Sequence, residues 1–136
     1  MSDAAQPMKK ILLVDDEPQI VDLFSTLLRE AGYRAVTAPN GAEALGLYLY
    51  ARYHEPFDLV VLDVSMPRID GLQVLETIRT DEAARGIACA EGLPIIVLTA
   101  YKSTCMLSFN LGCDDYVLKP VQPEALLAKI QSKIGR

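Results

Sequence analysis

The stretch LVVLDVSMPRIDG, residues 59–71, carries four consecutive apolar residues that end at the carboxylate of Asp63. A short apolar run bounded by turn-forming residues is typical of a strand buried on both faces, as in a parallel sheet. Asp63 then lies at the carboxyl end of the strand, where open α/β sheets bind their ligands. An aspartate in this position is also a common turn former or helix cap, so the rest of the chain decides whether Asp63 has a chemical role.

Similar patterns recur along the chain and predict its fold class. We expect strands at residues 11–14, 34–37, 57–62, 94–98 and 115–118. Between them, apolar residues at three-and-four spacing predict helices that begin near Pro18, Asn40, Gly71, Lys102 and Pro123. Five strands alternating with five helices predict an α/β fold, a doubly wound parallel sheet with a crevice where the winding reverses.

Three segments deviate from this regular alternation. Residues 1–9 are polar and show no periodicity, so we expect a flexible tail followed by one domain over residues 10–136. Between Thr80 and Leu93 the periodicity fails and small residues predominate, which predicts an extended connection. The helix over 102–111 has a weak pattern and is expected to be short or poorly formed. Since nothing follows Arg136 in the sequence, we expect no output domain.

Composition excludes several classes of function. The formal net charge is -5 and no Lys/Arg run is present, so direct binding to nucleic acid is not expected. No apolar stretch reaches the length of a membrane helix, and the amino terminus lacks a signal core. The odd number of cysteines, without metal-ligand spacing, suits reduced thiols in a cytoplasmic protein. The single histidine, His54, lacks the neighbours of a metal site.

Polar residues follow four of the predicted strands and therefore meet at one edge of the sheet. Asp15 and Asp16 follow the first strand, Asp63 the third, and the fourth and fifth end in Thr99 and Lys119. Clustered carboxylates repel one another, and a hard divalent cation such as Mg²⁺, with its preference for oxygen ligands, relieves that repulsion. A carboxylate beside Mg²⁺, a lysine and a hydroxyl suits phosphoryl transfer, with Asp63 as the nucleophile.

The motifs that carry these residues resemble those of a known family. They are LLVDDEP at 12–18, LDVSMP at 62–67 with Asp70-Gly71, LTA at 98–100, and GCDDYVLKP at 112–120. Together and in this order they are similar to the receiver domain of bacterial two-component response regulators. The resemblance covers Lys10 to about Ile134, and it implies a flavodoxin-like sheet with strand order 2-1-3-4-5.

The resemblance also implies roles for individual residues. Asp63 corresponds to the phosphoacceptor, and Asp15, Asp16, Asp63 and the backbone carbonyl of Ser65 to the Mg²⁺ ligands.

Thr99 corresponds to the hydroxyl that moves toward the phosphoryl oxygen, and Lys119 to the cation that pairs with it. Tyr116 corresponds to the aromatic that swings inward on activation. The Lys119-Pro120 peptide bond is expected to be cis.

Partners follow from the resemblance as well. We expect the phosphoryl donor to be a sensor histidine kinase or a histidine phosphotransfer protein. A downstream protein is expected to bind the face formed by the fourth helix, the fifth strand and the fifth helix, and the chain itself to be a monomer or weak dimer. Two alternatives stay open: a Mg²⁺-dependent phosphohydrolase of small phosphate esters, in which Ser65 stands where such enzymes carry a second aspartate, and a binding module whose acids are not phosphorylated.

Overall fold

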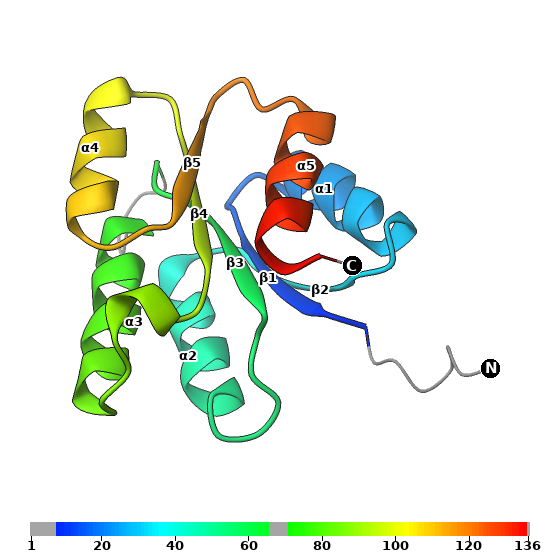
Figure 1. Ribbon diagram of the computed structural model, residues 1–136. Helices are drawn as coiled ribbons and strands as arrows, with labels where there is room; N and C mark the ends of the chain where they lie inside the picture. The colour runs from blue at the N-terminus through cyan, green and yellow to red at the C-terminus, as the bar shows by residue number, and fades with distance from the viewer. Residues whose placement is uncertain (1–7, 66–70, 136) are drawn as a thin grey trace.

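Five parallel strands form the centre of the computed structural model, which describes residues 8–65 and 71–135 (Figure 1). The strands are β1 (Lys10–Val14), β2 (Arg34–Ala38), β3 (Leu59–Asp63), β4 (Ile95–Thr99) and β5 (Asp115–Leu118). Their order is β2-β1-β3-β4-β5, and every pair of neighbours is parallel. The predicted α/β fold class and strand order are therefore confirmed.

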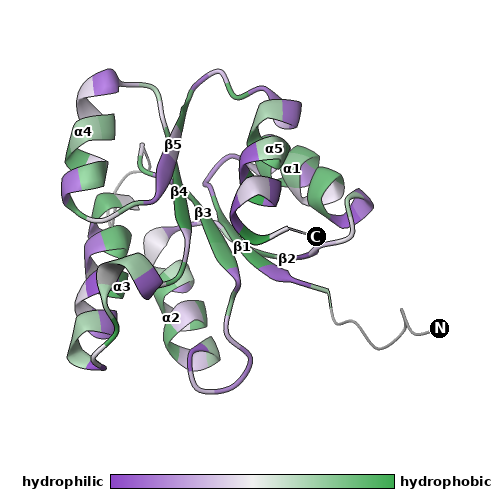
Figure 2. Ribbon diagram, in the orientation of Figure 1, coloured by the Kyte–Doolittle hydropathy of each residue, from purple (hydrophilic) through white to green (hydrophobic). Residues whose placement is uncertain are grey.

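Helices cover both faces of the sheet. On one face lie α1 (Pro18–Glu30) and α5 (Pro123–Ile134); on the other lie α2 (Gly41–Ala51), α3 (Gly71–Ala84) and α4 (Lys102–Asn110) (Figure 1). Every residue of β3 and β4 is buried, which explains why these strands are continuous apolar runs up to their last residues, Asp63 and Thr99 (Figure 2). Alternate residues of each strand enter one of two apolar cores, the first under α2 and α3 and the second under α1 and α5.

Local signals fix the ends of several helices as expected. Pro18 and Pro123 occupy the first turn of α1 and α5, where a missing N–H costs little. The side chain of Asn40 caps α2 by accepting a hydrogen bond from the Glu43 amide at 2.8 Å. Gly32 follows α1 with a φ of 97°, a conformation that favours glycine.

The predicted extended connection between Thr80 and Leu93 was wrong in two respects. Helix α3 does not stop near Thr80 but continues to Ala84, and the connection to β4 contains a short 3₁₀ helix, η2 (Cys89–Glu91), in place of a purely extended segment. Buried Glu82 in the last turn of α3 explains the failed periodicity, because a charged residue there occupies a core-facing position. Helix α4 is formed over nine residues, although only Cys105 and Ser108 of its side chains are buried.

Backbone hydrogen bonds at the carboxyl edge of the sheet hold the polar residues in place. The amide of Asp15 donates to Ala38, that of Val64 to Leu98, and that of Lys119 to Thr99. The strand order reverses beside β1, so the residues that follow β1 and β3 meet at the switch point, where doubly wound folds bind ligands.

None of the helices within residues 8–65 and 71–135 has the length and apolar character that crossing a lipid bilayer requires. Of the expected tail, residues 1–7 lie outside the described part of the chain, whereas the carbonyl of Lys9 accepts a hydrogen bond from Arg34 at 2.9 Å.

Candidate functional site

Asp63 and Lys119 form a direct ion pair at the carboxyl edge of the sheet. Lys119 Nζ lies 3.0 Å from Asp63 Oδ2, and the amide of Ser65 donates to Asp63 Oδ1 at 2.8 Å. The aspartate is buried, whereas a quarter of the lysine side chain is exposed. Burial lowers the pKa of Lys119, but the hydrogen bond and charge of Asp63 outweigh this effect and hold that pKa above its ordinary value. Lys119 therefore stays cationic beside Asp63.

Asp15 brings a second buried carboxylate to the same place. Its Oδ1 accepts a hydrogen bond from the Glu17 amide at 3.0 Å, while Oδ2 is buried without a hydrogen-bond partner among the described residues. Burial, together with the nearby charge of Asp63, raises the pKa of Asp15 from 3.8 to about 6. An unpaired buried carboxylate oxygen is costly unless a ligand satisfies it.

The acids that follow β1 suit a hard divalent cation. Carboxylate oxygens of Asp15, Asp16 and Glu17 lie within 4.8 Å of one another, Asp15 buried and the other two exposed. Oxygen donors of this kind, with room for water on the exposed side, are what Mg²⁺ prefers. The unpaired oxygen of Asp15 makes these residues fit the predicted metal. Glu17 was not predicted as a ligand, although it continues the acidic run that begins at Asp15.

Thr99 is the last residue of β4, the neighbour of β3, and Tyr116 lies in β5, the strand that Lys119 follows. The buried hydroxyl of Thr99 accepts a hydrogen bond from the Tyr101 amide at 3.1 Å. The partly buried ring of Tyr116 stands edge-on to Phe109 of α4, with ring centroids 5.6 Å apart. The Lys119-Pro120 peptide bond is cis, as the resemblance implies.

Gly71, the first residue of α3, packs directly against the backbone of the strand that ends in Asp63. A Cβ atom at Gly71 would lie 2.5 Å from the Asp63 carbonyl oxygen and 2.6 Å from Val64 Cα. Only glycine fits there, which was not predicted from the sequence. Residues 66–70, which are the whole stretch between Ser65 and Gly71 and include Met66, Pro67 and Asp70 of the predicted motif, lie outside the described residues.

A largely apolar groove of about 190 Å³ opens beside the ion pair. Its walls come from α1, the end of β4 and the segment after β5: Ile20, Leu23, Phe24, Leu98, Pro120 and Val121, with Asp15, Glu17 and Lys119 as its polar members. A molecule in this groove therefore touches the charged site and apolar side chains together.

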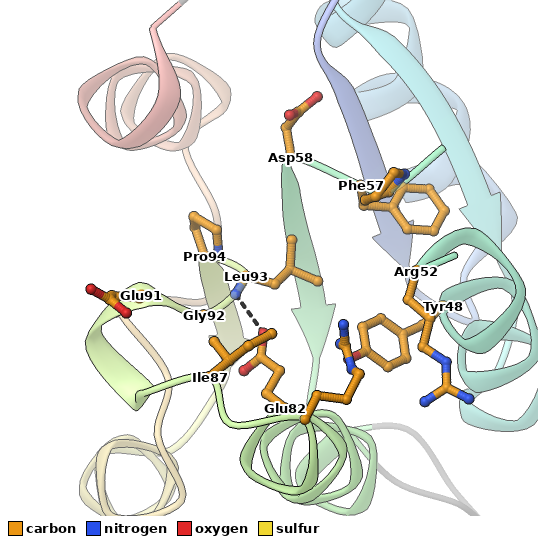
Figure 3. Close-up of a pocket in the computed structure, with 12 residues that line it drawn as sticks. Tyr48, Arg52, Phe57, Asp58, Glu82, Ile87, Glu91, Gly92, Leu93 and Pro94 are labelled. Atoms are coloured by element: carbon orange, nitrogen blue, oxygen red, sulfur yellow. Dashed lines mark hydrogen bonds between the residues drawn. The ribbon is translucent and has the colours of Figure 1, made fainter. Parts of the chain in front are cut away.

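A larger cavity of about 320 Å³ lies at the opposite end of the sheet, where β3 and β4 begin (Figure 3). Glu82, Arg52 and Arg85 in its wall are paired within the protein: Glu82 accepts a hydrogen bond from the Leu93 amide at 2.6 Å and forms an ion pair with Arg79 at 2.7 Å. Arg52 and Arg85 pair with the Asp81 carboxylate, which also accepts a hydrogen bond from Tyr48. The groove beside Lys119 is smaller, but its wall includes Asp15, whose buried Oδ2 has no hydrogen-bond partner among the described residues.

The structure is a doubly wound α/β domain with acidic residues and a lysine gathered at the carboxyl edge of its sheet, and comparison with known proteins identifies the family. Residues 11–131 match the profile of the response regulator receiver domain, so the chain belongs to that family. The phosphohydrolase alternative is not favoured by this match.

Individual relatives agree with this assignment. The chain is 39% identical over 130 residues to the probable transcriptional regulator ycf27 of Guillardia theta, covering 94% of this chain and 46% of that protein. It is 38% identical to the alkaline phosphatase synthesis transcriptional regulatory protein PhoP of Bacillus subtilis, covering 94% of this chain and 49% of that protein. The chain thus spans about half the length of the curated relatives it matches.

Solved structures show the same fold over nearly the whole chain. The chemotaxis protein CheY4 of Vibrio cholerae superposes with a TM-score of 0.77 at 30% identity, covering 93% of this chain and 99% of that one. A chain from the co-crystal of the Saccharomyces cerevisiae phosphotransfer protein Ypd1 with the receiver domain of Ssk1 gives 0.84 at 27% identity, covering 94% and 90%.

Proposed function

We propose that Asp63 accepts a phosphoryl group from a phosphohistidine on a sensor histidine kinase or a histidine phosphotransfer protein. The observation that carries this proposal is the pairing of buried Asp63 with Lys119, 3.0 Å apart, beside the unpaired buried oxygen of Asp15. The site concentrates one nucleophilic carboxylate and a cation at an edge that ligands can reach. Phosphorylation then changes the conformation of the domain and its affinity for partners.

The reaction needs charge neutralisation more than covalent assistance from the protein. An Asp63 oxygen attacks phosphorus, the phosphorus–nitrogen bond of the donor breaks, and the donor imidazole keeps the electron pair and takes a proton. Lys119, already within hydrogen-bond distance of Asp63, neutralises charge on the transferred oxygens. Asp15, Asp16, Asp63 and the Ser65 carbonyl would hold Mg²⁺, which supplies further positive charge when bound.

Thr99 and Tyr116 would report phosphorylation to the partner face. The Thr99 hydroxyl, now bonded to the Tyr101 backbone, would turn to a phosphoryl oxygen on Asp63. This movement releases the Tyr101 amide at the start of α4 and lets the Tyr116 ring change its packing on Phe109. The two arrangements form a two-state equilibrium that phosphorylation shifts.

Two surfaces suit the expected partners. The groove at Lys119 presents Leu23, half exposed, next to the charged site, so a donor helix can seat apolar side chains there while its histidine meets Asp63. The face of α4, β5 and α5 exposes Met106, Leu107 and Phe109 and would receive the downstream protein. Both partners and the cytoplasmic location suit a chain with buried free thiols at Cys105 and Cys113.

Intact-mass measurement after incubation with acetyl phosphate tests the proposal. With Mg²⁺ the chain should gain the mass of one phosphoryl group, and chelation of the metal or the Asp63→Asn substitution should abolish the gain. No adduct in the wild-type protein would contradict the proposal. Sustained turnover of an aryl phosphate would instead support a phosphohydrolase.

A further inference from the structure

Helix α2 exposes an outer face that is almost free of charge. Two adjacent stripes, each spaced i, i+4, i+7 and i+11, continue from the helix into the turn that follows it. The stripes are Ala42, Gly46, Leu49 and Tyr53, and Glu43, Leu47, Tyr50 and His54. All eight residues are exposed, whereas Ala44, Tyr48 and Ala51 on the inner side are buried. We refer to these eight residues as the α2 outer face.

This face is unusual for the surface of a protein in water. Leu47, Leu49, Tyr50 and Tyr53 expose 36%, 39%, 67% and 66% of their area. A surface helix normally turns charged residues outward, and one that is apolar all round is normally covered. Four large apolar side chains gathered on one helix face therefore indicate an interaction surface.

The α2 outer face is complementary in shape to a second copy of itself. One stripe begins with two small residues, Ala42 and Gly46, and a Cβ atom at Gly46 would meet nothing within 4 Å. The carboxyl-terminal half of the face carries Leu49, Tyr50 and Tyr53. When two copies pack antiparallel about a two-fold axis with Glu43 opposite His54, Leu49 and Tyr53 of each copy lie on Gly46 and Ala42 of the other, and Tyr50 lies on Leu47. A two-fold interface requires this self-complementarity.

The charges on the face follow the same arrangement. Glu43 and His54 stand at opposite ends of one stripe, about 16 Å apart along a helix, too far to pair within one chain. In an antiparallel dimer each Glu43 meets His54 of the second copy. His54 is held in place by stacking on Tyr50, with ring centroids 4.0 Å apart, and its Nδ1 donates to the Tyr50 carbonyl. The other ring nitrogen, Nε2, is then the atom that can hydrogen-bond to the incoming carboxylate.

From these observations we propose that the α2 outer face is the interface of an antiparallel, two-fold symmetric homodimer. It is separate from the α4, β5 and α5 face, and it does not depend on phosphorylation of Asp63. Sedimentation velocity of the unphosphorylated protein, over a range from micromolar to millimolar, should show a reversible monomer–dimer equilibrium. A chain that stays monomeric over that whole range would overturn the proposal.

Matched substitutions locate the interface. Gly46→Glu and Leu49→Glu should each raise the dimer dissociation constant by about tenfold or more, because each places a charge in an apolar contact. Gly46→Glu is compatible with the folded monomer, since the space there is open and glutamate favours a helix more than glycine does. Leu107→Glu on α4, where the leucine is exposed to a similar extent, is the control and should leave association unchanged. Loss of association in Leu107→Glu alone would assign the interface to α4.

A charge swap tests the antiparallel arrangement. Glu43→Arg and His54→Glu should each weaken the dimer, because each puts like charges or an unpaired charge at the contact. The double variant restores opposite charges between copies and should recover most of the affinity. A double variant that associates no better than either single one would show that these residues do not meet.

Discussion

Replacing Asp15 by Asn should stabilise the metal-free protein. Asp15 is buried, its Oδ2 has no hydrogen-bond partner among the described residues, and the charged Asp63 lies nearby. These features raise the pKa of Asp15 from 3.8 to about 6. An acid whose pKa is raised in the folded state opposes folding when it ionises, so at pH 7.5 the ionised group costs about 3 kcal/mol. Asparagine keeps the acceptor for the Glu17 amide and removes the charge.

The pH dependence has a definite sign. Well below pH 3.8 Asp15 is protonated in both the folded and unfolded states, and it costs nothing. As pH rises from about 4 to 6 the unfolded state loses its proton first, so this group's contribution to stability falls, and above pH 6 the full cost is present. The Asp15→Asn variant should lack this fall.

Urea denaturation in Mg²⁺-free buffer measures the effect. We expect a gain in the free energy of unfolding of about 1–3 kcal/mol at pH 7.5, and no gain for the exposed control Glu76→Gln. Adding Mg²⁺ should stabilise the wild-type protein by mass action and the variant far less. A variant that is less stable than the wild type without metal, or that gains as much from Mg²⁺, would refute the assignment of Asp15 as a strained metal ligand.

Three further predictions concern packing and buried polar groups. Gly71→Ala should lower the free energy of unfolding by about 1–3 kcal/mol and slow phosphorylation, because the added Cβ would lie 2.5 Å from the Asp63 carbonyl oxygen. Thermal or urea unfolding measures the effect, and a variant as stable as the wild type would contradict this close contact. Asp81→Ala should lower the free energy of unfolding by about 1–3 kcal/mol, because the side chains of Tyr48, Arg52 and Arg85 lose their hydrogen-bond acceptor. An unchanged free energy of unfolding would mean that water replaces the carboxylate. Burial raises the pKa of Cys113 to about 11, so at pH 8 the Cys113 thiol should be alkylated much more slowly in the folded protein than in the protein unfolded by urea. Peptide mass spectrometry measures both rates, and equal rates would contradict the burial of Cys113.

Much of the fold could be predicted because a doubly wound sheet leaves strong marks in the sequence. Strands buried on both faces are continuous apolar runs, and β5 was predicted with its observed bounds, residues 115–118. Pro18 and Asn40 marked helix starts for reasons that hold locally. The end of α3 could not be predicted, because the charge of Glu82 is accommodated by Arg79 and the Leu93 amide, contacts that exist only in the folded chain.

The candidate site, like the fold, could be predicted only in part. Strand direction alone predicted that Asp15, Asp63 and Lys119 meet at one edge, and the structure brings them together. The need for glycine at Gly71 depends on how α3 packs against the end of β3, and the orientation of the Thr99 hydroxyl depends on the turn into α4. Neither leaves a periodic signal in the sequence. Roles that depend on motion or on partners stay predictions.

The central claim is that Asp63 is the phosphoacceptor, and the measurement that tests it most directly locates the phosphoryl group. The protein is treated with acetyl phosphate and Mg²⁺, then reduced with borohydride, which converts an aspartyl phosphate to homoserine, and its peptides are sequenced by mass spectrometry. We predict homoserine at position 63, and at no other aspartate. Homoserine at position 15 or 16, or no homoserine in a protein that carries the added phosphate, would contradict the claim.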